Sequence, residues 1–205
     1  MENMYNLDIS FKFIEHAIIS VCYLFIYMSI PILYIMNIII TGGTVNITDV
    51  TGFLNQLTNL GSKYNITIQA LNADLISGSR HLQSAVNKTL RSFSSLNNAA
   101  NDPGMEIMMY ASGRRQIERA LVIGIKKGKM RIAIVLIGEN AVDEATVEVE
   151  ALLDTIDPGV IDYSDIKREE IMDFFDITTD EINAVGKEKI PELVLERVAL
   201  IDVFK

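Results

Sequence analysis

Residues 130–137 read MRIAIVLI, and this nearly uninterrupted apolar run constrains the fold more than any other segment. A strand with one face in water alternates apolar and polar side chains, whereas a strand covered on both faces reads as a continuous apolar run. The run therefore predicts a strand that is buried on both faces of its sheet. It places the chain in the α/β or α+β class.

Hydrophobic periodicity supplies the other elements. Three further strands are expected at residues 38–41, 65–71 and 105–111, with Gly42-Gly43 forming a turn after the first. Helices are expected where apolar residues recur at three- and four-residue steps, at residues 49–61, 79–96 and 114–124. In the last of these helices the residues expected to face inward are Ile117, Ala120 and Leu121. These elements predict a small mixed sheet covered by amphipathic helices.

The charge distribution changes abruptly after residue 138. Residues 36–138 carry 11 basic and 5 acidic side chains, whereas residues 139–205 carry 6 basic and 19 acidic ones. The acidic C-terminal part is expected to be helical, with a helix at 139–153, a turn at 157–159 and three shorter helices, the last at 191–203. No linker separates the two parts, so we expect one domain over residues 36–205. The net charge of −9 argues against a nucleic-acid partner, but the basic middle region argues for one.

The first 35 residues form a hydrophobic N-terminal extension. Residues 17–36 carry no charge over about 20 positions, which is long enough for a helix to cross a bilayer. The positive flank is weak, because only Lys12 precedes the run, and the run continues into residues 38–40, which the first strand requires. We expect an over-extended start, with Met36 as the natural first residue of a cytoplasmic protein. The alternatives are membrane association through residues 17–36 and an extension that packs on the domain.

Several classes of chemistry lack the residues they need. The single cysteine, Cys22, cannot form an internal disulfide, and the chain has no zinc-ribbon, iron–sulfur or CxxC motif. No phosphate-binding glycine loop or calcium-binding loop is present. Ser79 and His81 are two residues apart on a predicted helix, so they point in different directions and cannot act as nucleophile and base. We therefore expect no catalytic activity, no metal and no cofactor.

Three segments carry a family resemblance. They are residues 73–93 (ADLISGSRHLQSAVNKTLRSF), 106–128 (EIMMYASGRRQIERALVIGIKKG) and 193–205 (LVLERVALIDVFK). In this order and spacing they resemble the CGI-121 family, over about residues 36–205. Members of that family include an archaeal subunit of the KEOPS complex and the human protein that binds the p53-related kinase. We expect the chain to be an archaeal member.

The resemblance implies a small α/β protein without a catalytic role of its own. Family members bind the N-lobe of the complex's atypical kinase/ATPase and stimulate it, and they bind tRNA, including its 3′ CCA end. The complex installs the threonylcarbamoyl group on adenosine 37 of tRNAs that read ANN codons. The implied partners are the kinase subunit, tRNA and, indirectly, the subunit that transfers the threonylcarbamoyl group, with no small-molecule substrate.

The helix at 79–96 gives the strongest independent indication of an RNA-binding surface. Its polar face is basic, and no acidic residue interrupts it, whereas a solvated helix usually mixes charges of both signs. Basic side chains neutralise phosphates, and a histidine can stack on an unpaired base. A second basic group lies within and just after residues 114–124. The predicted tRNA-binding residues are Arg80, His81, Lys88, Arg91, Arg114, Arg115, Lys126, Lys127 and Lys129. The ordinary explanations are a solvated helix face, a structural histidine and a solvated turn.

The C-terminal helix suggests a protein partner. Its apolar face must be buried and consists of Ile190, Leu193, Val194, Val198 and Ile201. Leu195 and Ala199 lie on roughly the opposite side, where exposed apolar side chains are consistent with a binding surface. We expect the kinase interface either there or at Met108 and Met109. The competing functions are a membrane-anchored or soluble protein-binding module without RNA binding, and a small nucleotide- or acyl-transfer enzyme.

Overall fold

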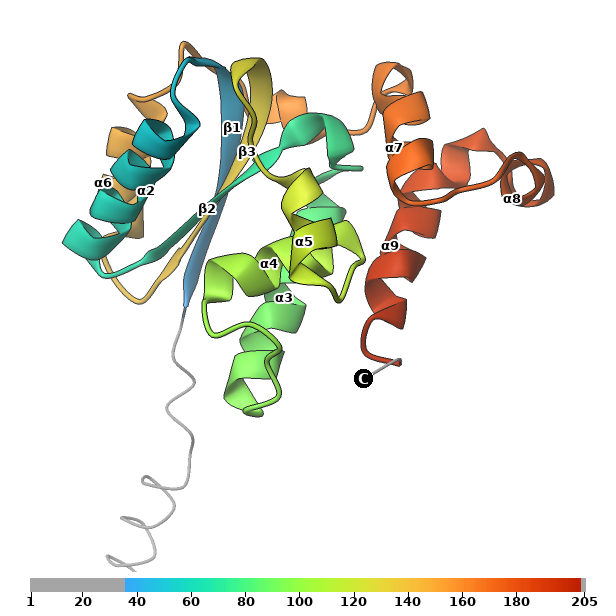
Figure 1. The fold of residues 1–205 in the computed structure, drawn as a ribbon, viewed down its shortest axis with the longest axis horizontal. Helices are drawn as coiled ribbons and strands as arrows, with labels where there is room; N and C mark the ends of the chain where they lie inside the picture. Colours follow the sequence, from blue (N-terminus) through green and yellow to red (C-terminus); the bar gives the residue numbers. More distant parts are fainter. Residues whose placement is uncertain (1–35, 204–205) are drawn as a thin grey trace, which may run out of the picture. The chain divides into compact units, whose positions relative to one another are not determined.

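The strand predicted from the apolar run is β3 (Gly128–Gly138), and its residues 132–137 are all buried. The structure, a computed structural model, describes residues 36–203, so the expectations for residues 1–35 concern positions outside the described part. β3 lies between β1 (Asn37–Ile47) and β2 (Thr67–Asn72) in a four-stranded sheet of order β2-β3-β1-β4 (Figure 1). The short β4 (Thr155–Ile156) pairs with β1.

Every strand pairing in this sheet is antiparallel. β1 and β3 pair along their full length, from Asn37 opposite Gly138 to Ile47 opposite Gly128. β2 pairs with β3 from Thr67 opposite Ile137 onward. The predicted α/β class is confirmed, but the sheet is antiparallel rather than mixed.

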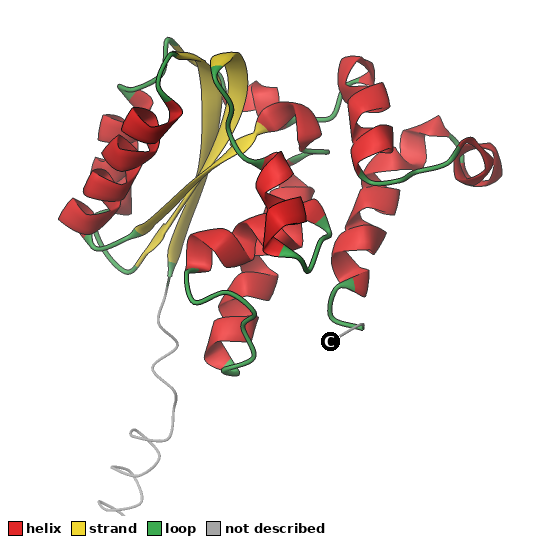
Figure 2. Ribbon diagram, viewed as in Figure 1, coloured by secondary structure: helices red, strands yellow, loops and turns green. Residues whose placement is uncertain are grey.

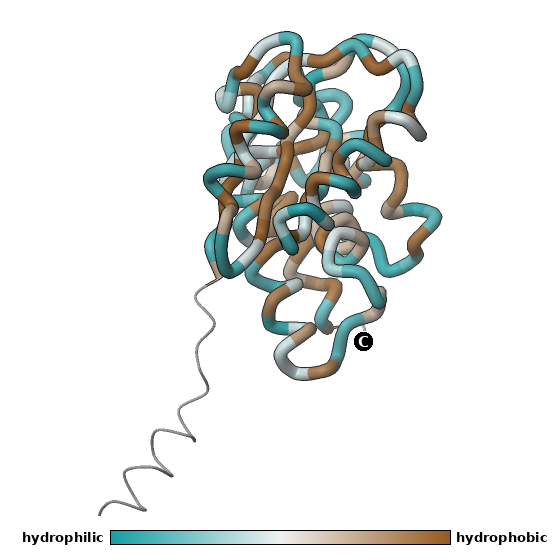
Figure 3. Tube along the Cα trace, turned by 90° about the vertical axis from the view of Figure 1, so that its left-hand side faces the viewer, coloured by the Kyte–Doolittle hydropathy of each residue, from teal (hydrophilic) through white to brown (hydrophobic). Residues whose placement is uncertain are grey.

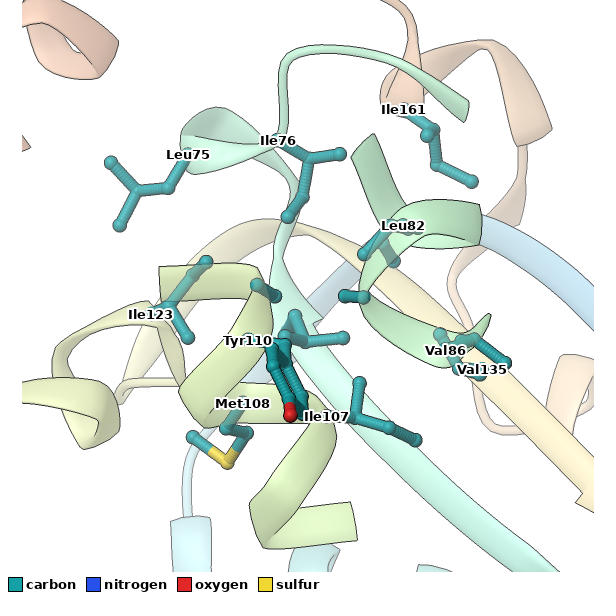
Figure 4. Packing of buried hydrophobic residues seen from close by; sticks show 14 of the residues in the cluster. Leu75, Ile76, Leu82, Val86, Ile107, Met108, Tyr110, Ile123, Val135 and Ile161 are labelled. Atoms are coloured by element: carbon teal, nitrogen blue, oxygen red, sulfur yellow. The ribbon is translucent and has the colours of Figure 1, made fainter. Parts of the chain in front are cut away.

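Helices cover both faces of the sheet because β3 contributes buried side chains to each face in turn. On one face, Ile132, Ile134 and Leu136 pack in a cluster with α2 (Val50–Tyr64) and α6 (Val142–Glu150). On the other face, Ala133, Val135 and Ile137 pack with α3 (Ser79–Ser94) and α4 (Pro103–Ser112). Figure 2 shows the two helix layers on either side of the strands, and Figure 4 shows the packing around Val135. In Figure 3 a long hydrophobic stretch runs through the interior, while the helices alternate hydrophobic and hydrophilic segments.

The acidic C-terminal part is helical, as predicted. Its helices are α7 (Arg168–Phe174), α8 (Thr179–Val185) and α9 (Ile190–Leu200), which share a third apolar cluster that includes Ile171, Ile182 and Val194. α9 also packs against α3. Short elements connect these parts: η1 (Ala73–Leu75), α5 (Ile117–Ala120), η2 (Leu121–Ile123), η3 (Pro158–Ile161), η4 (Asp165–Lys167) and η5 (Lys187–Lys189).

The predicted turn at Gly42-Gly43 is wrong, because β1 runs through both residues. A Cβ atom at Gly43 would lie 2.0 Å from the carbonyl oxygen of Thr155 and 3.0 Å from Leu153. The glycine is therefore needed for the close approach of β4 to β1, which the local sequence does not reveal.

The strand predicted at residues 105–111 is also wrong, because this segment is the helix α4. Asp102 caps the helix by accepting a hydrogen bond from the Met105 N–H at 2.8 Å, and Pro103 occupies the first turn. Gly113, in the left-handed conformation at φ 65°, ends it. Eight of its 10 residues are buried, so it lacks a polar face, and a short apolar run of this kind reads equally as a strand.

Residues 114–124 form only α5 and η2 rather than one amphipathic helix. Ala120 is buried as expected, but Ile117 and Leu121 are 46% and 50% exposed, not inward-facing.

Gly43→Ala tests the close packing of β4. The added methyl group must displace the Thr155 backbone, so we expect a loss of about 1–3 kcal/mol in the free energy of unfolding. Urea denaturation measures this. The matched control is Gly52→Ala in α2, where a Cβ meets only the carboxylate of Asp49 and helix propensity favours alanine by up to about 1 kcal/mol. Equal effects at the two glycines would contradict the assignment.

Candidate functional site

The outward side of α3 is a basic and polar surface, as the sequence predicts. The apolar side of the helix buries Leu82, Ala85 and Val86 against the sheet. The opposite side carries Arg80, Gln83, Ser84, Asn87 and Arg91, which we call the α3 face. No acidic residue lies within α3. Among the ion pairs of residues 36–203, none includes Arg80 or Arg91, so both guanidinium groups are available to a ligand.

Three hollows follow one another along α3. The residues of the α3 face and Leu195 of α9 line a hollow of about 400 Å³. Gln83 and Asn87 also line a neighbouring hollow of about 610 Å³, whose apolar lining comes from Ile38, Ile40 and Ile161. Arg91 also lines a third hollow of about 200 Å³, together with Lys88, Tyr110 and Asp202. Because each hollow shares residues with the next, the surface is continuous along a helix about 24 Å long.

Lys88 lies at the end of this surface and is held by neighbours. Its Nζ pairs with the carboxylate of Asp202 and lies 5.7 Å from the centre of the Tyr110 ring. The Tyr110 hydroxyl donates to Asp202 Oδ1 at 3.0 Å. The side chain of Lys88 is 12% exposed, so this residue joins α3 to α4 and to the end of α9 more than it presents a free charge.

His81 is buried and is not part of the surface, which corrects its prediction as an RNA contact. Its Nδ1 accepts from the Ser77 N–H at 3.2 Å, so its Nε2 carries the proton and donates to the Ala111 carbonyl at 2.7 Å. The ring also packs edge-on against the ring of Phe175, with 5.5 Å between the two ring centroids. Burial lowers the pKa of His81 from 6.5 to about 4, outweighing the Ala111 hydrogen bond, so the imidazole is neutral. The histidine is a structural contact between α3, α4 and the end of α7.

The second predicted basic group is not in one place. Arg114 donates to the Phe174 carbonyl at 2.7 Å and pairs with Asp176 at 2.8 Å. Arg115 is exposed beside it and lines a separate hollow of about 330 Å³ with Arg114. Lys126, Lys127 and Lys129 are exposed where β3 begins, with Lys129 opposite Asn46 of β1. None of these five residues lines the hollows along α3.

Met108 and Met109 are 5% and 4% exposed, so the structure removes them as kinase contacts. They are buried because α4 is enclosed on nearly all sides. On α9, Leu195 is half-buried and Ala199 is exposed, whereas the five residues predicted to be buried are buried.

An exposed apolar patch at α5 and η2 was not predicted from the sequence. Ile117, Leu121 and Val122 are each between 45% and 50% exposed and lie within six residues of one another. The spacing of three to four residues suggested an inward face, but the helix ends after one turn and the side chains stay outside. This patch is a second candidate surface for a protein partner.

The buried Lys167 was also missed. Its Nζ donates to the carbonyl of Val160 at 2.5 Å and to that of Ile76 at 3.4 Å, and the residue is 2% exposed. Burial, reinforced by the charge of Arg131, lowers the pKa of Lys167 to about 8. The lysine thereby connects η4 to η3 and η1.

Within residues 36–203, no group of three or more histidine, cysteine, aspartate or glutamate side chains is arranged to hold a metal ion. In the same part of the chain, no helix has the length and apolar character needed to span a bilayer.

Comparison with known proteins identifies relatives. The family model described as kinase binding protein CGI-121 matches residues 45–202. The curated regulatory protein Cgi121 of Methanocaldococcus jannaschii is 34% identical over 156 residues, which span 74% of this chain and 91% of that protein. The family match therefore covers helices of both layers, the strands β2, β3 and β4, and the last three residues of β1.

The neutral state of His81 predicts a pH-dependent stability. Because the folded pKa of about 4 is below the unfolded value of 6.5, the unfolded chain binds the proton first as the pH falls. The contribution of neutral His81 to the free energy of unfolding is fully present above pH 6.5 and is lost between pH 6.5 and 4. The free energy of unfolding should therefore fall by about 2–3 kcal/mol between pH 7 and pH 4.5. Denaturant titrations across this range, on the native chain and on His81→Gln, measure it.

The variant should be less stable at pH 7 but should lose much less stability on acidification. The Arg197 side chain lowers the pKa of Glu181 to about 2, so the stability that this carboxylate contributes is present above pH 4.5 and is lost mainly below it. Its loss therefore falls mostly outside the His81 window. Parallel pH profiles for the two proteins would refute the assignment.

Proposed function

The chain belongs to the CGI-121 family of kinase-binding proteins, and from this premise we propose that it is a non-catalytic subunit of a KEOPS complex that binds tRNA along the α3 face and stimulates the kinase/ATPase subunit. In this role it supports threonylcarbamoyladenosine formation at tRNA position 37 in the cytoplasm. It needs no cofactor and no small-molecule substrate. The observation that carries the RNA part is the continuous run of three hollows along a helix face with two unpaired arginines.

The α3 face suits a single-stranded end, such as the 3′ CCA of tRNA, better than a duplex. Arg80 and Arg91 neutralise phosphates, and the amide and hydroxyl groups between them donate hydrogen bonds to the backbone. The neighbouring hollow has an apolar lining on which an unstacked base can pack. Of the 19 acidic residues after position 138, Asp162 and Asp202 line these hollows, and the other 17 disfavour phosphates elsewhere on the surface.

The outer side of α9 is the proposed kinase contact. Ala199 is exposed there, and the buried side of the helix is already used inside the protein. Leu195 lines the α3 hollow as well, so an RNA end on α3 and a kinase on α9 would lie next to each other. This arrangement would let the subunit deliver tRNA to the complex that modifies it.

A double reversal, Arg80→Glu with Arg91→Glu, tests RNA binding. Its affinity for tRNA should fall by more than about tenfold at low salt. The slope of log binding constant against log salt concentration should decrease in magnitude by about 1.4 if each arginine contacts one single-stranded phosphate. Fluorescence anisotropy with mature tRNA and with tRNA lacking CCA measures both quantities. Both side chains are exposed, so the thermal melt should not change.

The matched control is Lys187→Glu with Lys189→Glu, which makes the same reversal at exposed lysines of η5. The control should bind tRNA with about the affinity of the native chain. If the two double variants lose affinity equally, binding depends on net charge alone and the α3 assignment fails. Absence of any tRNA binding would leave the alternative of a protein-binding module without RNA.

Ala199→Glu tests the kinase interface without touching the α3 hollows. It should end co-purification with the kinase subunit while tRNA affinity stays within about twofold, since the residue lines none of the three hollows. The comparison variant is Leu121→Glu, in the exposed apolar patch. Loss of the kinase with Leu121→Glu but not with Ala199→Glu would transfer the interface to α5 and η2.

A further inference from the structure

The outer edge of β2 is a place where the sheet can gain a strand, and we propose that it binds an extended basic peptide segment by strand addition. β2 is the last strand on its side of the sheet. The opposite edge is formed by β4, which is only two residues long. This surface is separate from the α3 face and does not depend on RNA binding.

The hydrogen bonds of the sheet determine which groups of β2 point outward. Backbone groups of successive residues in an antiparallel strand point to alternate sides. The Asp157 N–H donates to the Gly42 carbonyl at 2.9 Å, so the polar groups of Gly42 point toward β4. Those of Thr41 then point toward β3, where Thr41 is opposite Ile134.

The same alternation carries across β3. Because the polar groups of Ile134 point toward β1, those of its partner in β2, Ala70, point away from the sheet, and so do those of Ile68. In the described part of the chain, one hydrogen bond outside the strand ladders reaches these two residues: Gln69 Nε2 donates to the Ala70 carbonyl at 2.9 Å. The strand therefore covers its own outer carbonyl with a neighbouring side chain.

A groove of about 510 Å³ runs along this edge. Residues 66–70 line it together with residues of α2, including Leu54, which is 41% exposed, and with Asp102 and Gly104 at the start of α4. Gly104 lies so close to Gln69 that an added Cβ would be 2.6 Å from the amide oxygen. The Gln69 side chain therefore lies between β2 and α4 and covers Ala70, which is 2% exposed. A peptide strand can pair with the outer edge of β2 once this side chain moves aside.

The shape and charge of the groove specify its occupant. Asp102 and Glu139 are its charged lining residues, and both carboxylates are exposed, so a segment with basic side chains is complementary. Helices on both sides of the sheet border the groove, so it suits one extended segment better than the sheet of a second copy, which brings its own covering helices. The occupant is thus an extended basic peptide from a partner protein.

Binding of a fluorescein-labelled VRVRVR peptide to the full chain tests the proposal by anisotropy. The control peptide has the same sequence with every backbone amide methylated, which keeps the charge and removes the backbone hydrogen-bond donors.

Gln69→Ala should tighten binding of the unmethylated peptide by about three- to tenfold, the equivalent of one net hydrogen bond. Ile68→Pro should abolish binding, since it removes an outward N–H but no bond to β3. Asp102→Asn, which keeps the helix cap, should weaken binding at low salt.

Equal binding of the two peptides, or no gain with Gln69→Ala, would overturn strand addition. Sedimentation provides a further check, because a dimer that forms on Gln69→Ala without peptide binding would show that a second copy occupies the edge. A melt of Ile68→Pro verifies its fold, and the methylated peptide keeps the test decisive if that variant unfolds.

Discussion

The burial of β3 on both faces is the constraint on which the rest of the structure depends. A strand with seven consecutive buried residues needs a helix layer on each side, and β1 and β2 must pair with it to satisfy its backbone. α3 is fixed by this requirement, because its apolar side has to cover Val135 and its neighbours. The polar side of α3 is then directed outward, so the packing of the core also sets the position of the surface proposed for RNA.

Two residues that resemble RNA ligands in the sequence hold that surface in place instead. His81 joins the start of α3 to the end of α4, and Lys88 joins the other half of α3 to Tyr110 and Asp202. Buried polar groups are stabilising only when they have hydrogen-bond or ion-pair partners, and His81 and Lys88 both have them. The arginines that remain outside are thereby presented on a helix anchored at two points.

The sequence predicted the elements whose patterns are regular and failed where packing decides. The prediction of α3 rests on an apolar period that is clear over more than ten residues, and that of β3 rests on a nearly continuous apolar run of eight residues. The prediction ends the first strand at Thr41 because the close approach of Thr155 to Gly43, which requires a glycine within β1, is a tertiary effect. The strand prediction for the α4 segment fails because a helix buried on nearly all sides has no apolar period to detect. The same burial explains why Met108 was misplaced on the surface. For the candidate site, the exposed arginines were predictable from charge, whereas the burial of His81 and the pairing of Lys88 depend on α4 and on the end of α9.

Lys167 has a consequence for surface mapping. Its amine is enclosed by the carbonyls of Val160 and Ile76, so an amine-directed reagent reaches it only when this cover opens. In an amine-labelling time course, surface lysines react at rates set by the reagent. Lys167 reacts at a rate set by the separation of η4 from η3 and from the end of η1, and so reports how often this contact opens.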